Sequence, residues 1–288
     1  MKAVSYDLKG VKTAAEALDS AELNWEAQPV NLLTESGIAV PDHRAIVRSD
    51  NNGVIGVVGS RYLPIQNSFG FSFFDTVCDQ YNAKYDRAYV VDGGHKVILE
   101  ATVNGAITIR KGDDVFKKIR LINTFDGSSP FMAQFSIWRQ ICKNGLMGWA
   151  KENKCKVHHT KNAECRAAEA LRIMSTSVEY FKKFEIQLKQ LANKIIDRKQ
   201  IDQFIKQCMN PKKDAVSTRL KNDIAEVEKL FEAGAGTGQG TGYDIFNSYV
   251  EWIDHYRSAD AETRLANAII GSVSMKEHAF EVISNICL

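Results

Sequence analysis

The sequence predicts an α+β protein, with an antiparallel sheet and packed helices in the N-terminal half and a helical C-terminal half. Three β-type runs, Tyr85–Val91, Lys96–Val103 and Asp114–Asn123, follow one another with tight or moderate turns. Consecutive strands joined in this way are antiparallel neighbours in most folds. After His159 the apolar residues recur at helical spacing instead. The chain has 288 residues, of which 44% are hydrophobic and 25% charged, so it can bury a core.

The segments before these strands have clear local signals. The turn Asp50–Gly53 tolerates positive φ and indicates a hairpin between Ala45–Arg48 and Val54–Val58. Apolar residues spaced by three and four predict a helix that opens at Asn67 and runs through Tyr81. At the N-terminus we expect a short helix around Val11–Leu23, followed by an extended segment.

The segment after the three strands begins with a helix signal. Ser128 and Ser129 can cap free N–H groups, Pro130 suits a first helical turn, and Gly145 stands where a helix would stop. These signals predict a helix over Phe131–Asn144. Short strands around 146–149 and 155–158 would then complete the sheet.

The second half is predicted to be almost entirely helical. A broken apolar stripe over Leu171–Phe204 indicates a long helix or a helical hairpin, and Pro211 breaks it. Further helices are expected over Asp214–Ala233, Tyr243–Arg257 and Asp260–Cys287, the last interrupted near residues 271–272. The expected organisation is an N-terminal helix and arm at 1–44, an α+β core at 45–160, a long helical region at 161–233, a flexible Gly-rich linker at 234–242, and C-terminal helices at 243–288.

Composition narrows the function classes. The formal net charge is +2, so the chain as a whole is not markedly basic. No apolar run is long enough to span a bilayer and the start lacks a signal-peptide core, so we expect a cytoplasmic protein without membrane partners. Six cysteines in a chain of this length are too sparse for a disulfide framework.

Basic residues gather in one segment. Between Arg110 and Arg172 there are thirteen Lys or Arg residues against six acidic ones, with aromatic residues interspersed. Lysines that follow phosphates and rings that stack on bases are what a single-strand binder needs. The candidate nucleic-acid-binding residues are Lys117, Lys118, Arg120, Arg139, Lys143, Lys151, Lys154 and Lys156. The alternative is that the aromatic residues form core and the lysines a solvated face.

Other chemistry is not supported by the sequence. Cys142, Cys155, His158, His159 and Cys165 are potential zinc ligands, but their spacing matches no compact zinc motif. The glycine run 234–242 lacks the preceding strand and the Lys-Ser or Lys-Thr pair of a phosphate-binding loop. No serine elbow or acid–base set is present. We therefore expect no catalytic residues, no metal and no cofactor, and a protein that is not an enzyme.

Several phrases together resemble a known family. They are Arg48–Asp50, Gly56–Val58, Tyr62–Asn67, Asn123–Ser129 and Arg139–Gly145. In this order they resemble the phage/plasmid-like domain-of-unknown-function family of bacteriophages and mobile elements, over roughly residues 45–162, with a weaker echo at 247–255. The resemblance implies a phage or plasmid setting, and so the cytoplasm of a bacterial host cell, and it assigns no catalytic residues.

A weaker similarity concerns element order alone. A helix, three antiparallel strands and a second helix are similar to the core of single-strand annealing proteins of the eukaryotic recombination-mediator and phage lambda Beta types. This similarity and the basic segment lead us to expect a non-catalytic single-stranded DNA binder that forms homo-oligomers and promotes annealing or recombination. The alternative is a protein-binding module, such as an inhibitor of a bacterial defence complex, with a host or phage protein as its partner.

Overall fold

The computed structural model describes residues 2–139, 144–146, 154–160, 177–209, 217–258, 260–266, 269 and 272–288. Contacts divide the chain into two compact units that interleave along the sequence. Unit 1 comprises Met1–Asn104, Lys118–Phe135 and Ala150–Ser177. Unit 2 comprises Gly105–Lys117, Ser136–Trp149 and Val178–Leu288. The units interleave because the long central strands run from one unit into the other.

The main sheet has seven strands in the order β1-β5-β6-β7-β8-β10, with β9 pairing β8. Antiparallel pairing joins β1 to β5, β5 to β6, and β8 to both β9 and β10. The three strands expected at the centre are confirmed as β5, β6 and β7. The seven strands are β1 (Ala3–Asp7), β5 (Ala83–Val91), β6 (Lys96–Arg110), β7 (Asp113–Thr124), β8 (Phe131–Arg139), β9 (Asn144–Leu146) and β10 (Lys154–Val157).

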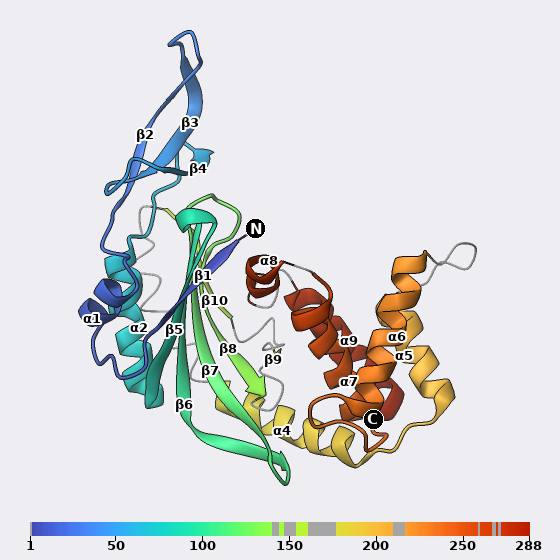
Figure 1. Cartoon of the computed structure of the whole chain (residues 1–288). Helices are drawn as coiled ribbons and strands as arrows, with labels where there is room; N and C mark the ends of the chain where they lie inside the picture. Colours follow the sequence, from blue (N-terminus) through green and yellow to red (C-terminus); the bar gives the residue numbers. More distant parts are fainter. Residues whose placement is uncertain are drawn as a thin grey trace. The chain divides into compact units, whose positions relative to one another are not determined.

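A second, three-stranded antiparallel sheet belongs to unit 1. It consists of β2 (Ala27–Leu33), β3 (Ala39–Arg48) and β4 (Val54–Gly59), in that order. The predicted turn between β3 and β4 is confirmed, and Asn52 in it has a φ of 57°. Figure 1 shows these strands extending away from the main sheet as an arm.

Two helices pack beside the main sheet within unit 1 (Figure 1). Helix α1 (Ala14–Ser20) packs on α2 (Asn67–Tyr81), and α2 contacts β5. Helix α2 begins at the predicted Asn67 and ends where Asn82 adopts the left-handed conformation. Its aromatic side chains meet those of the sheet, as in the edge-to-face contact of Phe73 with Phe131. The short 3-10 helix η1 (Asp92–Gly94) joins β5 to β6.

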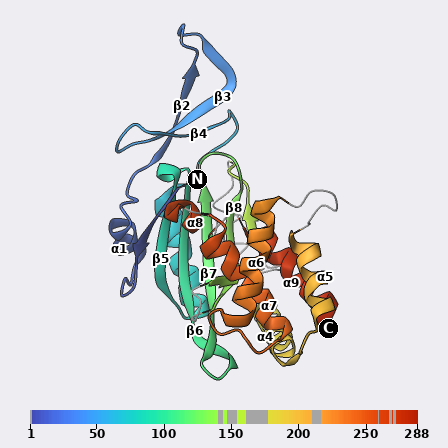
Figure 2. The same ribbon diagram turned by 45° about the vertical axis from the view of Figure 1, so that its right-hand side comes forward.

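Helices dominate unit 2, which confirms the α+β class with a helical C-terminal half (Figure 2). Helix α7 packs on α6 and α9, and α5 packs on α9. Within the described residues the apolar stripe is divided between two helices, because α4 ends at Asn193 and α5 begins at Arg198. The elements are α4 (Ser177–Asn193), α5 (Arg198–Met209), α6 (Thr218–Ala233), α7 (Gly242–Glu251), the π-helical turn η3 (Trp252–Tyr256), α8 (Ala261–Ala266) and α9 (Val273–Cys287).

The predicted helix over Phe131–Asn144 is wrong, because β8 occupies Phe131–Arg139. The Ser-Pro signal instead marks the turn from β7 into β8, where the Ser129 carbonyl accepts a hydrogen bond from Thr124 Oγ1. Phe131 and Phe135 contact α2 through Phe73 and Tyr81. The neighbouring strands β7 and β10 supply ladder partners that a local signal cannot reveal.

The glycine-rich segment 234–242, interpreted from its sequence as a flexible linker, makes specific hydrogen bonds. The Ile196 N–H donates to the Gly240 carbonyl, and the Gly242 N–H donates to the Lys194 carbonyl. Thr241 and Asp244 form a reciprocal capping box at the start of α7. Positive φ at three of its glycines lets the segment turn tightly into these contacts.

Candidate functional site

Two of the predicted DNA-binding residues lie in a buried ionic cluster of unit 1. Lys118 Nζ lies 2.5 Å from an Asp86 carboxylate oxygen and 3.2 Å from Glu100 Oε2. Arg120 Nε donates to Glu100 Oε1 over 2.8 Å, and the Tyr89 hydroxyl donates to the other oxygen of Glu100. Burial alone would raise the pKa of Glu100, but Arg120 and Lys118 hold it at about 2. Both basic side chains therefore serve to neutralise buried carboxylates.

Arg139 lies in a second buried cluster, in unit 2, and its side chain is fully buried. Its Nε donates to Asp113 over 2.8 Å, and its terminal nitrogens donate to the carbonyls of Ala235 and Gly236. The guanidinium also stands 5.0 Å from the centre of the Tyr243 ring. Arg139 thus holds the glycine-rich segment in place.

These positions correct the expected layout of the basic surface. Lys118 and Arg120 were predicted to bind nucleic acid, which needs exposed side chains, but both are buried against acidic residues. Arg139 was expected to lie in a helix over Phe131–Asn144, but it ends strand β8. Among the other candidates, Lys117 is half-exposed, Lys156 is exposed, and Lys154 begins β10. Lys143 and Lys151 lie outside the described residues.

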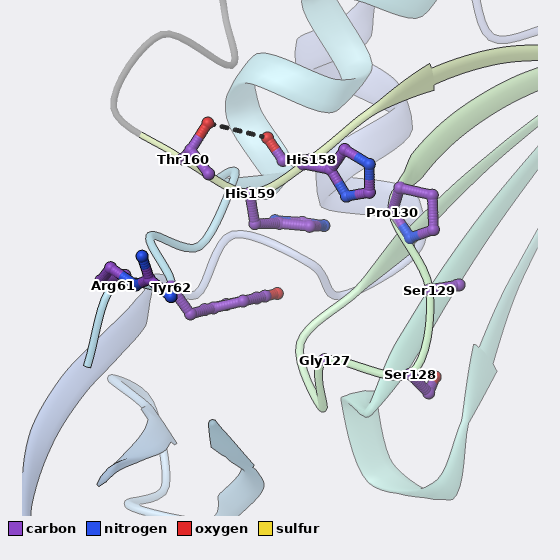
Figure 3. A pocket seen from close by; sticks show the side chains of 9 residues that line it. All are labelled: Arg61, Tyr62, Gly127, Ser128, Ser129, Pro130, His158, His159 and Thr160. Atoms are coloured by element: carbon purple, nitrogen blue, oxygen red, sulfur yellow. Dashed lines mark hydrogen bonds between the residues drawn. The ribbon is translucent and has the colours of Figure 1, made fainter. Parts of the chain in front are cut away.

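A pocket of about 460 Å³ opens in unit 1, where three segments far apart in the sequence meet (Figure 3). Its lining comes from Arg61 and Tyr62 after β4, from Gly127–Pro130 between β7 and β8, and from His158–Thr160 after β10. Figure 3 shows the ring of His159 lying over that of Tyr62, with the Gly127–Pro130 loop across the cavity.

The approach of β4 to the β7–β8 turn depends on a missing side chain. A Cβ at Gly56 would lie only 2.2 Å from the Phe125 carbonyl oxygen, so any other residue would push the two backbones apart. Gly127 has a φ of 73°, which L side chains rarely adopt. Gly127 therefore shapes the wall of the pocket, and Gly56 lets β4 approach the turn that contains it.

Side chains of the same region connect the segments. The Asn123 amide donates to the Ile65 carbonyl over 2.8 Å, and the Tyr62 hydroxyl donates to the Thr124 carbonyl. Burial, with a smaller contribution from Asp126, raises the pKa of Tyr62, so its hydroxyl stays protonated and remains a donor. Tyr62 thereby fastens the segment after β4 to the end of β7.

His159 forms the base of the pocket. The residue is only 5% exposed, and its ring stacks on Tyr62 with 4.7 Å between ring centres. Burial lowers the pKa of His159 to about 4, and the backbone of Leu63 offsets this only in part. The Ile65 N–H donates to Nδ1 over 3.3 Å, whereas Nε2 has no hydrogen-bond partner among the described residues.

The rim is more polar and open. Arg61 and His158 are exposed, and within the described part of the chain no ion pair engages the Arg61 guanidinium. An acidic residue is also close, since Asp126 Oδ1 accepts a hydrogen bond from the Ser128 N–H. The pocket can therefore offer N–H donors from Arg61 and the two imidazole rings to a ligand, with Asp126 limiting its net positive charge.

Sequence reasoning considered His159 only as a potential zinc ligand and passed over Tyr62 and Arg61. The structure assembles no group of three or more His, Cys, Asp or Glu residues suited to a metal within the described residues. In the same residues it contains no helix whose length and apolar character would let it cross a membrane. The family resemblance did point to this region of the chain, because Tyr62–Asn67 and Asn123–Ser129 were both among its phrases.

Comparisons with known proteins place the chain in a family without an assigned activity. No curated protein and no solved structure gives a significant match. A family model described as "Domain of unknown function (DUF932)" matches residues 54–271. The match covers more than half of the chain and includes all three segments that line the pocket. The chain therefore belongs to the DUF932 family of domains of unknown function.

Proposed function

We propose that this protein binds single-stranded DNA without catalysis, at the surface of unit 1 where the His159 pocket opens. The observation that carries this proposal is that the exposed residues Arg61 and His158 line the pocket, with exposed Lys156 two positions before His158. Lys156 and His158 occupy alternate positions of one extended segment, so both project to the same side of it. A backbone of phosphates can follow such a row of basic groups.

The interaction should be modest and electrostatic. Lys118, Arg120 and Arg139 are already paired with carboxylates, so fewer basic groups remain than the sequence count suggests. For single strands the logarithm of affinity falls with the logarithm of salt concentration by about 0.7 per phosphate contact. Two or three contacts therefore predict a slope of roughly −1.4 to −2.1. The binding should depend little on base sequence.

The wider setting is part of the same proposal. The family resemblance supports a phage or mobile-element protein in the bacterial cytoplasm that aids annealing or recombination. Exposed apolar side chains at Ile186 of α4 and Ile195 in the turn before α5 support assembly into a homo-oligomer, because they leave apolar surface uncovered. Light scattering at micromolar concentration, with and without oligonucleotide, tests this, and a monomeric mass in both samples contradicts it.

The binding site is tested with a charge-reversal pair. Arg61→Glu combined with Lys156→Glu should weaken binding of a fluorescent oligonucleotide at least about tenfold at low salt, because both changes repel phosphates. The matched control is Lys199→Glu with Lys221→Glu, which changes the net charge equally at exposed positions of α5 and α6. Equal losses in both variants would indicate a general charge effect and contradict a site at the pocket.

A protein-binding module is the second candidate function, and the arm of unit 1 favours it. The sheet β2-β3-β4 exposes several large apolar side chains, which is typical of a surface that meets another protein. These residues are Val30, Leu33, Ile38, Val54 and Val57. An inhibitor of a bacterial defence complex is one such module. Absence of oligonucleotide binding by the wild-type protein at low salt would favour this candidate over the first.

A further inference from the structure

The hydrogen bonds of His159 define what its free nitrogen can do. A backbone N–H can only donate, so the contact from Ile65 makes Nδ1 of His159 the acceptor. A neutral imidazole carries one proton, which must then reside on Nε2. Nε2 is therefore an N–H donor, and it has no acceptor among the described residues.

This donor is directed into the cavity. Figure 3 shows the outer edge of the His159 ring facing the space between Tyr62 and the Gly127–Pro130 loop. Nε2 itself is buried from water, so a ligand oxygen reaches it only when the ring or the facing loop shifts. A buried donor without a partner costs about 1–3 kcal/mol, and a ligand that supplies an acceptor removes that penalty. The pocket therefore favours a ligand that carries several hydrogen-bond-accepting oxygens.

The other polar groups that line the pocket indicate that its ligand is an anion. Arg61 contributes a fixed positive charge, and the exposed ring of His158 stands beside His159 at the mouth. A guanidinium offers its donors in a planar fork that matches phosphate oxygens. A metal ion is a poorer occupant, because the nitrogen of His159 that faces the cavity already carries a proton.

We propose that the pocket binds a phosphate group of a nucleotide, with Nε2–H of His159 donating at its base and Arg61 pairing with the charge at its rim. The inference rests on the proposed function, since it names the part of a DNA strand that this site recognises. A cavity of about 460 Å³ has room for a phosphate and part of its nucleoside. The phosphate comes either from the end of a strand or from a free nucleotide, which share this chemistry.

The direct test is nitrogen NMR of the full chain labelled at its histidines, with thymidine 5′-monophosphate and inorganic phosphate as probes. Both probes should shift the Nε2 resonance of His159 in a saturable manner, and thymidine should not. Arg61→Gln should weaken binding of thymidine 5′-monophosphate about tenfold, because a charge-assisted hydrogen bond is lost. Lys221→Gln, an exposed lysine of α6, is the matched control and should leave that affinity unchanged.

A second variant tests the donor itself. His159→Phe preserves a flat ring against Tyr62 but removes the N–H, and it should lower the affinity for thymidine 5′-monophosphate at least about tenfold. Should this variant fail to fold, Arg61→Gln still decides, because Arg61 is exposed and has no ion pair among the described residues to lose. A His159 resonance that responds equally to thymidine overturns the phosphate assignment.

Oligonucleotides separate this inference from the proposed function. A 5′-phosphorylated strand that binds more tightly than the same strand without the phosphate identifies the strand end as the source, whereas equal affinity together with binding of thymidine 5′-monophosphate identifies the free nucleotide. Oligonucleotide binding without any response of His159 to phosphate probes overturns the inference and leaves the function standing. Binding of thymidine 5′-monophosphate without oligonucleotide binding overturns the function and supports the phosphate site.

Discussion

Two groups of basic side chains in this protein have the same chemistry and opposite surroundings. Arg120 and Arg139 are buried against carboxylates in the two units, whereas Arg61 at the pocket and Lys156 on β10 are exposed. All four lie within or next to β-strands, so secondary structure does not distinguish them. The difference teaches that a basic residue becomes a binding residue only where the fold leaves its charge uncompensated.

The energetic consequences differ in the same way. Breaking a buried ion pair leaves an uncompensated charge inside the protein and typically costs 3–5 kcal/mol. Exposed charges contribute about 0–1 kcal/mol to folding, because water screens them. Substitutions in the first group should therefore act on stability, and substitutions in the second group on binding.

The largest effect is expected at Arg139. Arg139→Met removes the partner of buried Asp113 and the donors to the Ala235 and Gly236 carbonyls. We expect the free energy of unfolding to fall by about 3–5 kcal/mol. Chemical denaturation measures it, with Lys221→Met as the exposed control. A midpoint within error of the wild type would show that the cluster does not stabilise unit 2.

The next largest effect concerns Glu100 at acidic pH. Its pKa is about 2 in the folded protein and near the ordinary value of 4.5 when unfolded, so the unfolded state takes up a proton first as pH falls. Ionised Glu100 should therefore contribute about 3 kcal/mol to the free energy of unfolding above pH 4.5, and this contribution should be lost as the pH approaches 2. Unfolding curves measured across this range should show the loss, and Glu100→Gln should flatten that part of the profile. An unchanged slope in Glu100→Gln would contradict the assignment.

A somewhat smaller effect is expected at His159, in a different pH window. Its pKa is about 4 when folded and 6.5 as an ordinary histidine, so stability present above pH 6.5 should be lost as the pH falls toward 4. The open pocket gives the ring some access to water, so we expect about 2 kcal/mol rather than the full value. The same unfolding measurements on His159→Phe should lack this component. Nitrogen NMR should place the pKa of His159 well below that of an ordinary histidine.

The smallest effect on stability is expected for the exposed pair. Arg61→Glu with Lys156→Glu should change the free energy of unfolding by less than about 1 kcal/mol, because neither side chain is buried. Denaturation curves of this variant and of Lys199→Glu with Lys221→Glu should nearly coincide. A loss comparable to that of Arg139→Met would remove the distinction between the two groups of basic residues.

Elements with strong local signals were predictable from the sequence. The turn between β3 and β4, helix α2 from Asn67, and the strands β5 to β7 follow from turn residues and apolar spacing that act within a few residues. The helical second half follows from the same kind of pattern. The error at β8 has the opposite origin, since a good helix start at Ser129 and Pro130 was overridden by ladder partners in β7 and β10.

The sequence by itself determined the fold class, the order of most elements, and the concentration of basic residues between Arg110 and Arg172. Only the tertiary structure decided which of those charges are neutralised, because Glu100 and Asp113 reach Arg120 and Arg139 from other strands. It also decided the candidate site. His159 meets a residue nearly a hundred positions earlier, and a contact between such distant segments leaves no local pattern in the chain.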